Sequence, residues 1–141
     1  MVSCQEPWLI YCQHTNKYGF TETFHEDIQG HRQGLLIGTY HSKKVAYEYT
    51  YRNNEKHGTC ITYNDNGTPR KIENYKEGVL DGLYEEYNRD GRLKLRMRYI
   101  AGTITGQVES WDPLGKPSAW EYPSEPLEEV TRTIQNLPTI S

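Results

Sequence analysis

Glycine recurs at a fixed interval of 24 residues along most of this chain, at Gly34, Gly58, Gly82 and Gly106. A constant period of this length is the sequence signature of a protein built from similar units, each of which buries its apolar surface against its neighbours. The period therefore limits the fold to a repeat architecture before any residue is given a chemical role.

Four further columns of residues repeat in phase with these glycines. In chain order they are Gly30, Asn54, Gly78 and Gly102; Tyr51, Tyr75 and Tyr99, with Tyr122 one residue early; Tyr63, Tyr87 and Trp111; and Gly67, Gly91 and Gly115. Asn54 stands in place of glycine in the column that lies four residues before Gly34, Gly58, Gly82 and Gly106. Because asparagine is the residue that best tolerates positive φ after glycine, this column indicates a requirement of the backbone and not of a chemical group.

Each repeat reads as two strands joined by a tight turn. Between Arg92 and Tyr99 apolar and basic residues alternate, and side chains on a β-strand point to opposite faces with period two. This alternation places one basic set on a single face: Arg92, Lys94, Arg96 and Arg98. The preceding residues 88–91, Asn-Arg-Asp-Gly, predict a hairpin turn with a left-handed glycine. The equivalent residues 41–44 lack the glycine and predict a weaker turn.

The sequence therefore predicts an all-β fold: an elongated single-layer antiparallel meander of about five hairpins with a short C-terminal capping helix. We divide the chain into an N-terminal segment (1–7), a degenerate first hairpin and link (8–33), four repeats (34–57, 58–81, 82–105 and 106–122) and a C-terminal helix and tail (123–141). The hairpins themselves are expected at about 8–24, 35–51, 59–75, 83–99 and 107–122.

The C-terminal residues change character. Ser124 is a good helix N-cap, and an apolar stripe at helical spacing follows it, made of Leu127, Val130, Ile134 and Leu137. The helix either covers the open edge of the last repeat, which protects a sheet against edge pairing, or is offered to a partner or a second copy.

Composition argues against several classes of protein. The net charge of −3 argues against a nucleic-acid-binding protein, which is usually basic. The apolar run at residues 8–12 is too short for a signal sequence or a transmembrane segment. Cys4, Cys12 and Cys60 have no metal-ligand spacing and are expected to be reduced thiols. Together these features predict an intracellular, cytoplasmic protein.

The chain carries no recognisable catalytic signature. Its five histidines mostly flank turns or links, and none accompanies a nucleophile motif. Glu85 and Glu86 are adjacent on a strand, so they point to opposite faces and cannot share a proton. The group His25-Glu26-Asp27 with His31 lacks the spacing of two-histidine zinc motifs. We therefore expect a protein that is not an enzyme and that uses no cofactor or metal.

The aromatic columns have two roles open to them. Stacked as ladders they hold neighbouring hairpins together, and where they are exposed they offer tyrosine and tryptophan, the residues that dominate binding hot spots. The residues expected to bind a protein partner, or a second copy in a homodimer, are Tyr51, Tyr63, Tyr75, Tyr87, Tyr99, Trp111 and Tyr122 on the sheet and Leu127, Val130 and Ile134 on the helix.

Peripheral association with anionic membrane lipid is an alternative to a protein partner. It would use the basic strand Arg92, Lys94, Arg96 and Arg98. Cross-strand pairing of these cations with glutamates is the simpler role for them.

Several of these residues together resemble the MORN repeat, and in particular its second variety, found in short bacterial and viral proteins. The matching residues are Lys76, Glu77, Gly78, Gly82, Tyr84, Tyr87, Asn88, Asp90, Gly91 and Tyr99. The resemblance covers about residues 30–122 and implies a curved, single-layer sheet of hairpins with aromatic residues and glycines along one surface. It also implies scaffolding, dimerisation or lipid association, and relatives of this variety imply an antitoxin-like or virion or host-interaction role.

Overall fold

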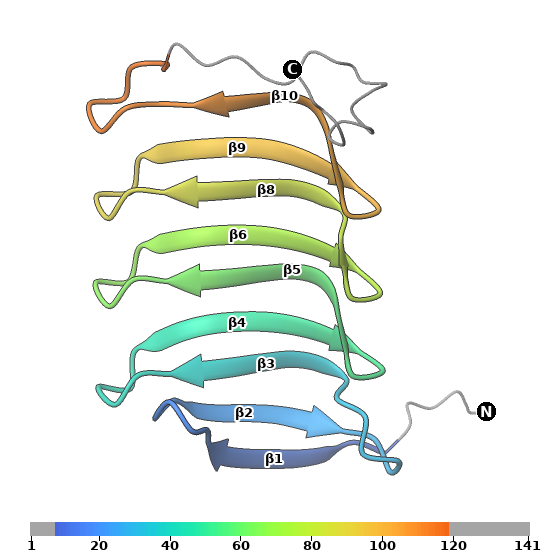
Figure 1. Cartoon of the computed structure of the whole chain (residues 1–141). Helices are drawn as coiled ribbons and strands as arrows, with labels where there is room; N and C mark the ends of the chain where they lie inside the picture. The colour runs from blue at the N-terminus through green and yellow to red at the C-terminus, as the bar shows by residue number, and fades with distance from the viewer. Residues whose placement is uncertain (1–7, 119–141) are drawn as a thin grey trace, which may run out of the picture.

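The protein folds into one open antiparallel sheet in which successive hairpins lie side by side in chain order (Figure 1). A computed structural model describes residues 8–118. The strands are β1 (Ile10–Thr15), β2 (Thr21–Glu26), β3 (Gly34–Thr39), β4 (Val45–Arg52), β5 (Glu55–Tyr63), β6 (Pro69–Lys76), β7 (Val79–Leu80), β8 (Gly82–Tyr87), β9 (Leu93–Ile100) and β10 (Thr103–Ser110). The short β7 pairs with β6, and the others follow the order β1-β2-β3-β4-β5-β6-β8-β9-β10.

The predicted all-β meander is confirmed, with four complete hairpins in the described residues. The fifth is represented by β10, a turn at residues 112–115 and a single bridge between Trp111 and Pro117. The C-terminal helix predicted for residues 123–141 lies outside the described residues, as do Tyr122, Leu127, Val130 and Ile134.

Turns at one side of the sheet share a three-residue loop that ends in a left-handed residue. In the loop after β5 the amide of Gly67 donates to the carbonyl of Asn64 (3.0 Å), and Gly67 has φ of 92°. This is a type I turn followed by a glycine bulge, as the sequence predicts. The turn before β4, which lacks a glycine, adopts the same conformation with Lys43 at φ of 76°. Lysine thus occupies a backbone conformation that favours glycine.

The turns after β4, β6 and β9, at the other side of the sheet, are two-residue loops with positive φ at both positions. Asn53 and Asn54 have φ of 50° and 73°, and Ala101 and Gly102 have 50° and 87°. These are the dihedral signs of type I′ hairpin turns, whose twist matches that of the flanking strands. The positive φ expected at Asn54 is confirmed, whereas the tightness of these loops was not predicted.

Two of the four glycines that define the 24-residue period, Gly58 and Gly106, lie at irregularities inside β5 and β10 and not before a strand as predicted, whereas Gly34 and Gly82 begin β3 and β8. Gly58 is inside β5, where Tyr49 pairs with Cys60 and Tyr51 pairs with Lys56. Three residues of β5 therefore oppose a single residue of β4, and Gly58 has φ of 107°. Gly106 sits at a similar register shift in β10. Positive φ lets the strand bend at these bulges without losing the pairing on either side.

The small core lies toward the N-terminal end of the sheet. It consists of Phe24, Leu36, Ala46 and Tyr47, which are all buried. The ring of Tyr47 lies over Gly38, its partner across the β3–β4 pair, where a Cβ would overlap the ring. Because the sheet has one layer, most other side chains stay partly exposed and both faces are available for contacts.

Candidate binding surfaces

One face of the sheet carries a continuous series of tyrosines. Directly paired residues of antiparallel strands lie on the same face, so the strand register assigns side chains to faces. Tyr49 pairs with Cys60, which pairs with Glu73, two residues before Tyr75. Extending the register through β8 and β9 places Tyr84 and Tyr99 on this side as well. We call this surface the tyrosine face; its tyrosines are Tyr47, Tyr49, Tyr51, Tyr75, Tyr84 and Tyr99.

The other predicted aromatic column lies on the opposite face. Tyr63 donates its hydroxyl hydrogen to Glu48 (2.9 Å), and Tyr87 donates to Glu85 (2.8 Å). Both glutamates point away from the tyrosine face, so the single aromatic face predicted from the sequence is wrong. Trp111 stands at the end of β10, and its amide donates to the Lys94 carbonyl (3.0 Å).

Two cations of the chain itself lie over rings of the tyrosine face. The Arg32 guanidinium is 4.7 Å from the ring centre of Phe24 and 5.6 Å from that of Tyr51. The Lys56 ammonium is 4.3 Å from the ring centre of Tyr49 and 5.1 Å from that of Tyr75. Arg32 and Lys56 are 24 residues apart, so the same contact is made in consecutive repeats.

The next position in this column is Leu80, which pairs with Tyr75. Within residues 8–118, no cation therefore lies over the rings of the third repeat. Tyr84 and Tyr99 meet edge to face there, with ring centres 5.8 Å apart.

Carboxylates alternate with the tyrosines on this face. Glu73, with 8% exposure, accepts a hydrogen bond from Tyr75 (3.2 Å), and Glu86 accepts one from Tyr84 (2.6 Å). Burial, followed by the negative charge of these carboxylates, raises the pKa of Tyr75 and of Tyr84 above the ordinary tyrosine value. The rings are therefore neutral hydrogen-bond donors, and the negative charge resides on the glutamates.

A related cluster lies in the first hairpins. Tyr47 donates to Glu22 (2.5 Å), and the His14 ring lies 2.8 Å from the same carboxylate. Burial opposes ionisation of Glu22, but the hydrogen bonds from Tyr47 and His14 outweigh it and hold the pKa of Glu22 below its usual value.

The basic strand does not present its four cations on one face, contrary to the alternation predicted from the sequence. A register shift lies between Glu86 and Tyr87, which pair with Leu95 and Leu93, so Lys94 is an extra residue in β9. Arg96 instead pairs with Glu85 (3.0 Å) and Glu109 (3.8 Å).

The other two cations of that strand differ in their surroundings. Arg92 lies 3.7 Å from Asp90 and donates to the Pro113 carbonyl (3.2 Å). Arg98 is exposed. The prediction that Glu85 and Glu86 point to opposite faces is confirmed, because Glu85 contacts Arg96 while Glu86 contacts Tyr84.

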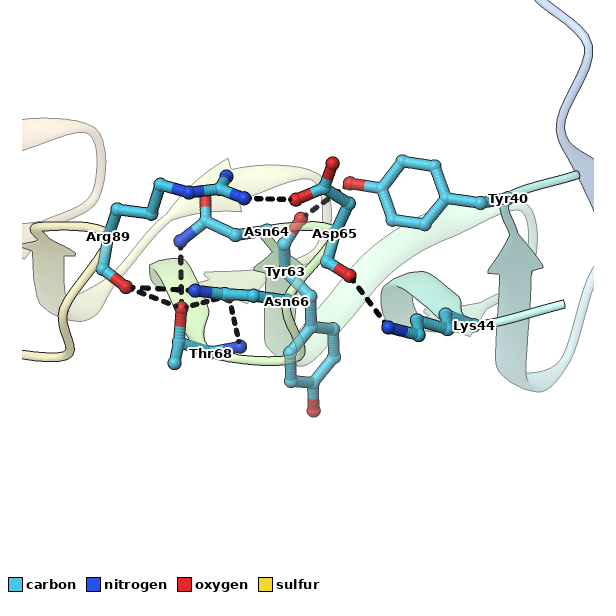
Figure 2. Close-up of polar contacts among 8 residues, drawn as sticks. All are labelled: Tyr40, Lys44, Tyr63, Asn64, Asp65, Asn66, Thr68 and Arg89. Carbon is cyan, nitrogen blue, oxygen red and sulfur yellow. Dashed lines mark hydrogen bonds and ion pairs between the residues drawn. The ribbon is translucent and has the colours of Figure 1, made fainter. Parts of the chain in front are cut away.

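Neighbouring turns are tied together by polar contacts that sequence reasoning missed (Figure 2). Tyr40 donates to the Tyr63 carbonyl (2.8 Å), and Asn66 donates to the Arg89 carbonyl (3.2 Å). The Arg89 guanidinium in turn reaches Asp65 (2.5 Å), one repeat away. Lys44, Asn64 and Thr68 complete the network that the figure draws. The 24-residue separation of Asp65 and Arg89 is the signal from which this pair was predictable.

The described residues contain no group of three His, Cys, Asp or Glu side chains that could hold a metal ion. In residues 8–118 there is likewise no helix long and apolar enough to cross a membrane.

The fold defines a protein made of stacked β-hairpins that expose both faces of one sheet. Residues 56–77, which span most of the β5–β6 hairpin, match the family model of a MORN repeat variant. The match identifies one MORN-type repeat within the chain, and repeats of this kind generally mediate binding. No curated protein matches the chain.

Proposed function

We propose that this protein is a non-catalytic scaffold whose tyrosine face holds an extended, basic segment of a protein partner. The observation that carries the proposal is the contact of Arg32 and Lys56 with the rings of this face. The chain places its own cations over the first two repeats, and Leu80 stands at the equivalent position of the third. A lysine or arginine of the partner would make the corresponding contact there.

The chemistry of the third repeat supports a cationic ligand. Tyr84 and Tyr99 supply aromatic surface, and Glu86 supplies negative charge beside it. A cation over a tyrosine ring contributes about 0.5–2 kcal/mol, more when water is excluded. An extended segment suits the surface because alternate side chains of a strand point the same way.

The two alternatives from the sequence are less well supported. In the lipid alternative, Arg96 is already paired with two glutamates and Arg92 with Asp90, which leaves Arg98 and Lys94 of the basic strand. A binding role for the C-terminal helix concerns residues outside those described.

The proposal is tested with a synthetic peptide that alternates lysine and threonine, and with a matched glutamate–threonine peptide. We expect saturable binding of the lysine peptide alone, measured by fluorescence anisotropy. Tyr99→Leu and Glu86→Gln should each weaken it about threefold to tenfold, the equivalent of one lost cation–π or ionic contact.

The matched controls are Tyr63→Leu and Glu85→Gln, which make the same changes on the opposite face. Equal losses from both pairs of variants, or equal binding of the two peptides, would overturn the proposal. Sedimentation with anionic liposomes distinguishes the lipid alternative from the proposal. A protein that binds the lysine peptide and does not sediment with the liposomes is not a lipid-surface protein.

A further inference from the structure

A basic groove of about 330 Å³ lies where β6, β8 and β9 meet their turns. The residues that matter for its chemistry are Arg70, Lys71, Glu86, Asn88, Arg89 and Lys94. Four of these six are cations, in a chain whose net charge is −3. The groove is therefore a local reversal of the protein's overall charge.

Two of the cations are brought to the groove by bulges. Arg70 is an extra residue opposite the step from Thr62 to Tyr63, and Lys94 is the equivalent extra residue one repeat later. The residue one repeat before Arg70 is Ala46, which is buried among the core residues. At this bulge position the first repeat has a buried methyl group, and the next two repeats have long, exposed cations.

The pairing of the cations leaves two of them without a counter-charge. Arg89 is bound to Asp65, and Lys71 lies 3.7 Å from Glu73. Within residues 8–118, Arg70 and Lys94 form no ion pair, and both are exposed. The carboxylate that lines the groove, Glu86, is engaged by Tyr84 (2.6 Å).

One residue that lines the groove, Asn88, also carries a buried donor that lacks an acceptor. Among the described residues, Asn88 Nδ2 is the one buried side-chain polar atom without a hydrogen-bond partner. Its equivalent one repeat earlier, Asn64, donates to the hydroxyl of Thr68 (3.0 Å). Arg92 stands in place of that threonine, so the acceptor is missing. An unpaired buried amide is unfavourable unless something else accepts its hydrogen.

We infer that this groove binds a soluble phosphate monoester or inorganic phosphate. Arg70 and Lys94 would balance a dianion, and a phosphate oxygen would accept the hydrogen of Asn88. A small ligand fits the charge distribution better than a membrane does, because the acidic chain as a whole is repelled by an anionic surface. The groove lies at the turn end of the tyrosine face, where Glu86 lines it, but phosphate binding there does not depend on the partner contact proposed for that face.

Titration of ¹⁵N-labelled protein with inorganic phosphate, against sodium chloride of equal ionic strength, tests the inference. We expect a saturable shift of the Asn88 side-chain amide resonance with phosphate alone. Arg70→Gln and Lys94→Gln should each reduce affinity by about tenfold or more, because each removes a charge-assisted contact. The control Arg98→Gln makes the same charge change on the opposite face and should leave affinity unchanged.

A second pair of variants tests the role of Asn88 with both groove cations intact. Arg92→Thr restores the acceptor that Thr68 supplies to Asn64, and Arg92→Val has nearly the same shape without the hydroxyl. Affinity for phosphate should fall in Arg92→Thr relative to Arg92→Val. An equal affinity in the two would contradict the assignment of Asn88.

Vesicles containing phosphatidic acid distinguish the source of the phosphate. We expect no co-sedimentation under conditions in which free phosphate saturates the groove. Binding of the vesicles without binding of free phosphate, or no saturable shift with either, would overturn the inference.

Discussion

Replacing Gly38 by alanine should be among the most damaging small changes in the sheet. A Cβ at this position would overlap the ring of Tyr47, which is 9% exposed and packs in the core with Phe24 and Leu36. The ring would have to move, and its hydroxyl would lose the hydrogen bonds to Glu22 (2.5 Å) and Asn16 (3.1 Å).

The magnitude follows from two contributions. Overpacking a buried site costs about 1–3 kcal/mol, and the loss of a hydrogen bond to a charged group costs about 1.5–3 kcal/mol. Because the ring can relax in part, we expect a net loss of about 3 kcal/mol for Gly38→Ala. Urea unfolding followed by circular dichroism should show a lower midpoint with an unchanged slope.

A double-mutant cycle isolates the contact. In a Tyr47→Ala background the ring is absent, so Gly38→Ala should cost less than about 0.5 kcal/mol. Additive effects of the two substitutions, or a single Gly38→Ala variant as stable as the parent, would refute the reasoning.

Three further predictions concern the turns, the tyrosines and the free edge. Lys43→Gly should stabilise the fold by about 0.5–1 kcal/mol, because relief of a left-handed lysine outweighs the backbone entropy of glycine; a lower midpoint in urea would contradict this. The raised pKa values of Tyr47, Tyr75 and Tyr84 mean that the folded state keeps protons which the unfolded state releases. Their contribution to the stability of the fold is therefore present below the ordinary tyrosine pKa of 10.0 and is lost as pH rises above that value. In an alkaline titration, tyrosinate absorbance should appear late and together with unfolding. Early, gradual ionisation of all tyrosines would argue against this pH dependence. Ile10→Lys, on an edge strand where Ile10 is 52% exposed, should reduce concentration-dependent self-association in analytical ultracentrifugation, since charge on an edge opposes strand pairing; an unchanged sedimentation profile in a protein that self-associates would exclude this edge as the contact.

Much of the fold was predictable because glycine and asparagine act locally. Each turn needs a residue in the left-handed conformation at a fixed place, so Gly67 and Asn54 predict the positions of their turns from the sequence alone. Lys43 shows the limit of that reasoning, since pairing with the neighbouring strands imposes the turn on an unfavourable residue.

The candidate site was less predictable because its geometry depends on bulges. A single extra residue reverses the face of every side chain beyond it, and the sequence gives no sign of where it falls. For this reason Lys94 lines the groove and not the face predicted for the basic strand, and Tyr63 and Tyr75 lie on opposite faces of the sheet. The cation contacts of Arg32 and Lys56 were in principle visible as a 24-residue repeat of basic residues.

The central claim is that the tyrosine face binds a partner's basic side chains while the opposite face does not. Labelling the tyrosine rings with ¹³C and titrating the lysine–threonine peptide measures this directly, because each ring reports on its own face. We predict that the resonances of Tyr84 and Tyr99 shift and saturate together, while those of Tyr63 and Tyr87 stay in place. Shifts at Tyr63 and Tyr87, or none at any ring, would contradict the claim.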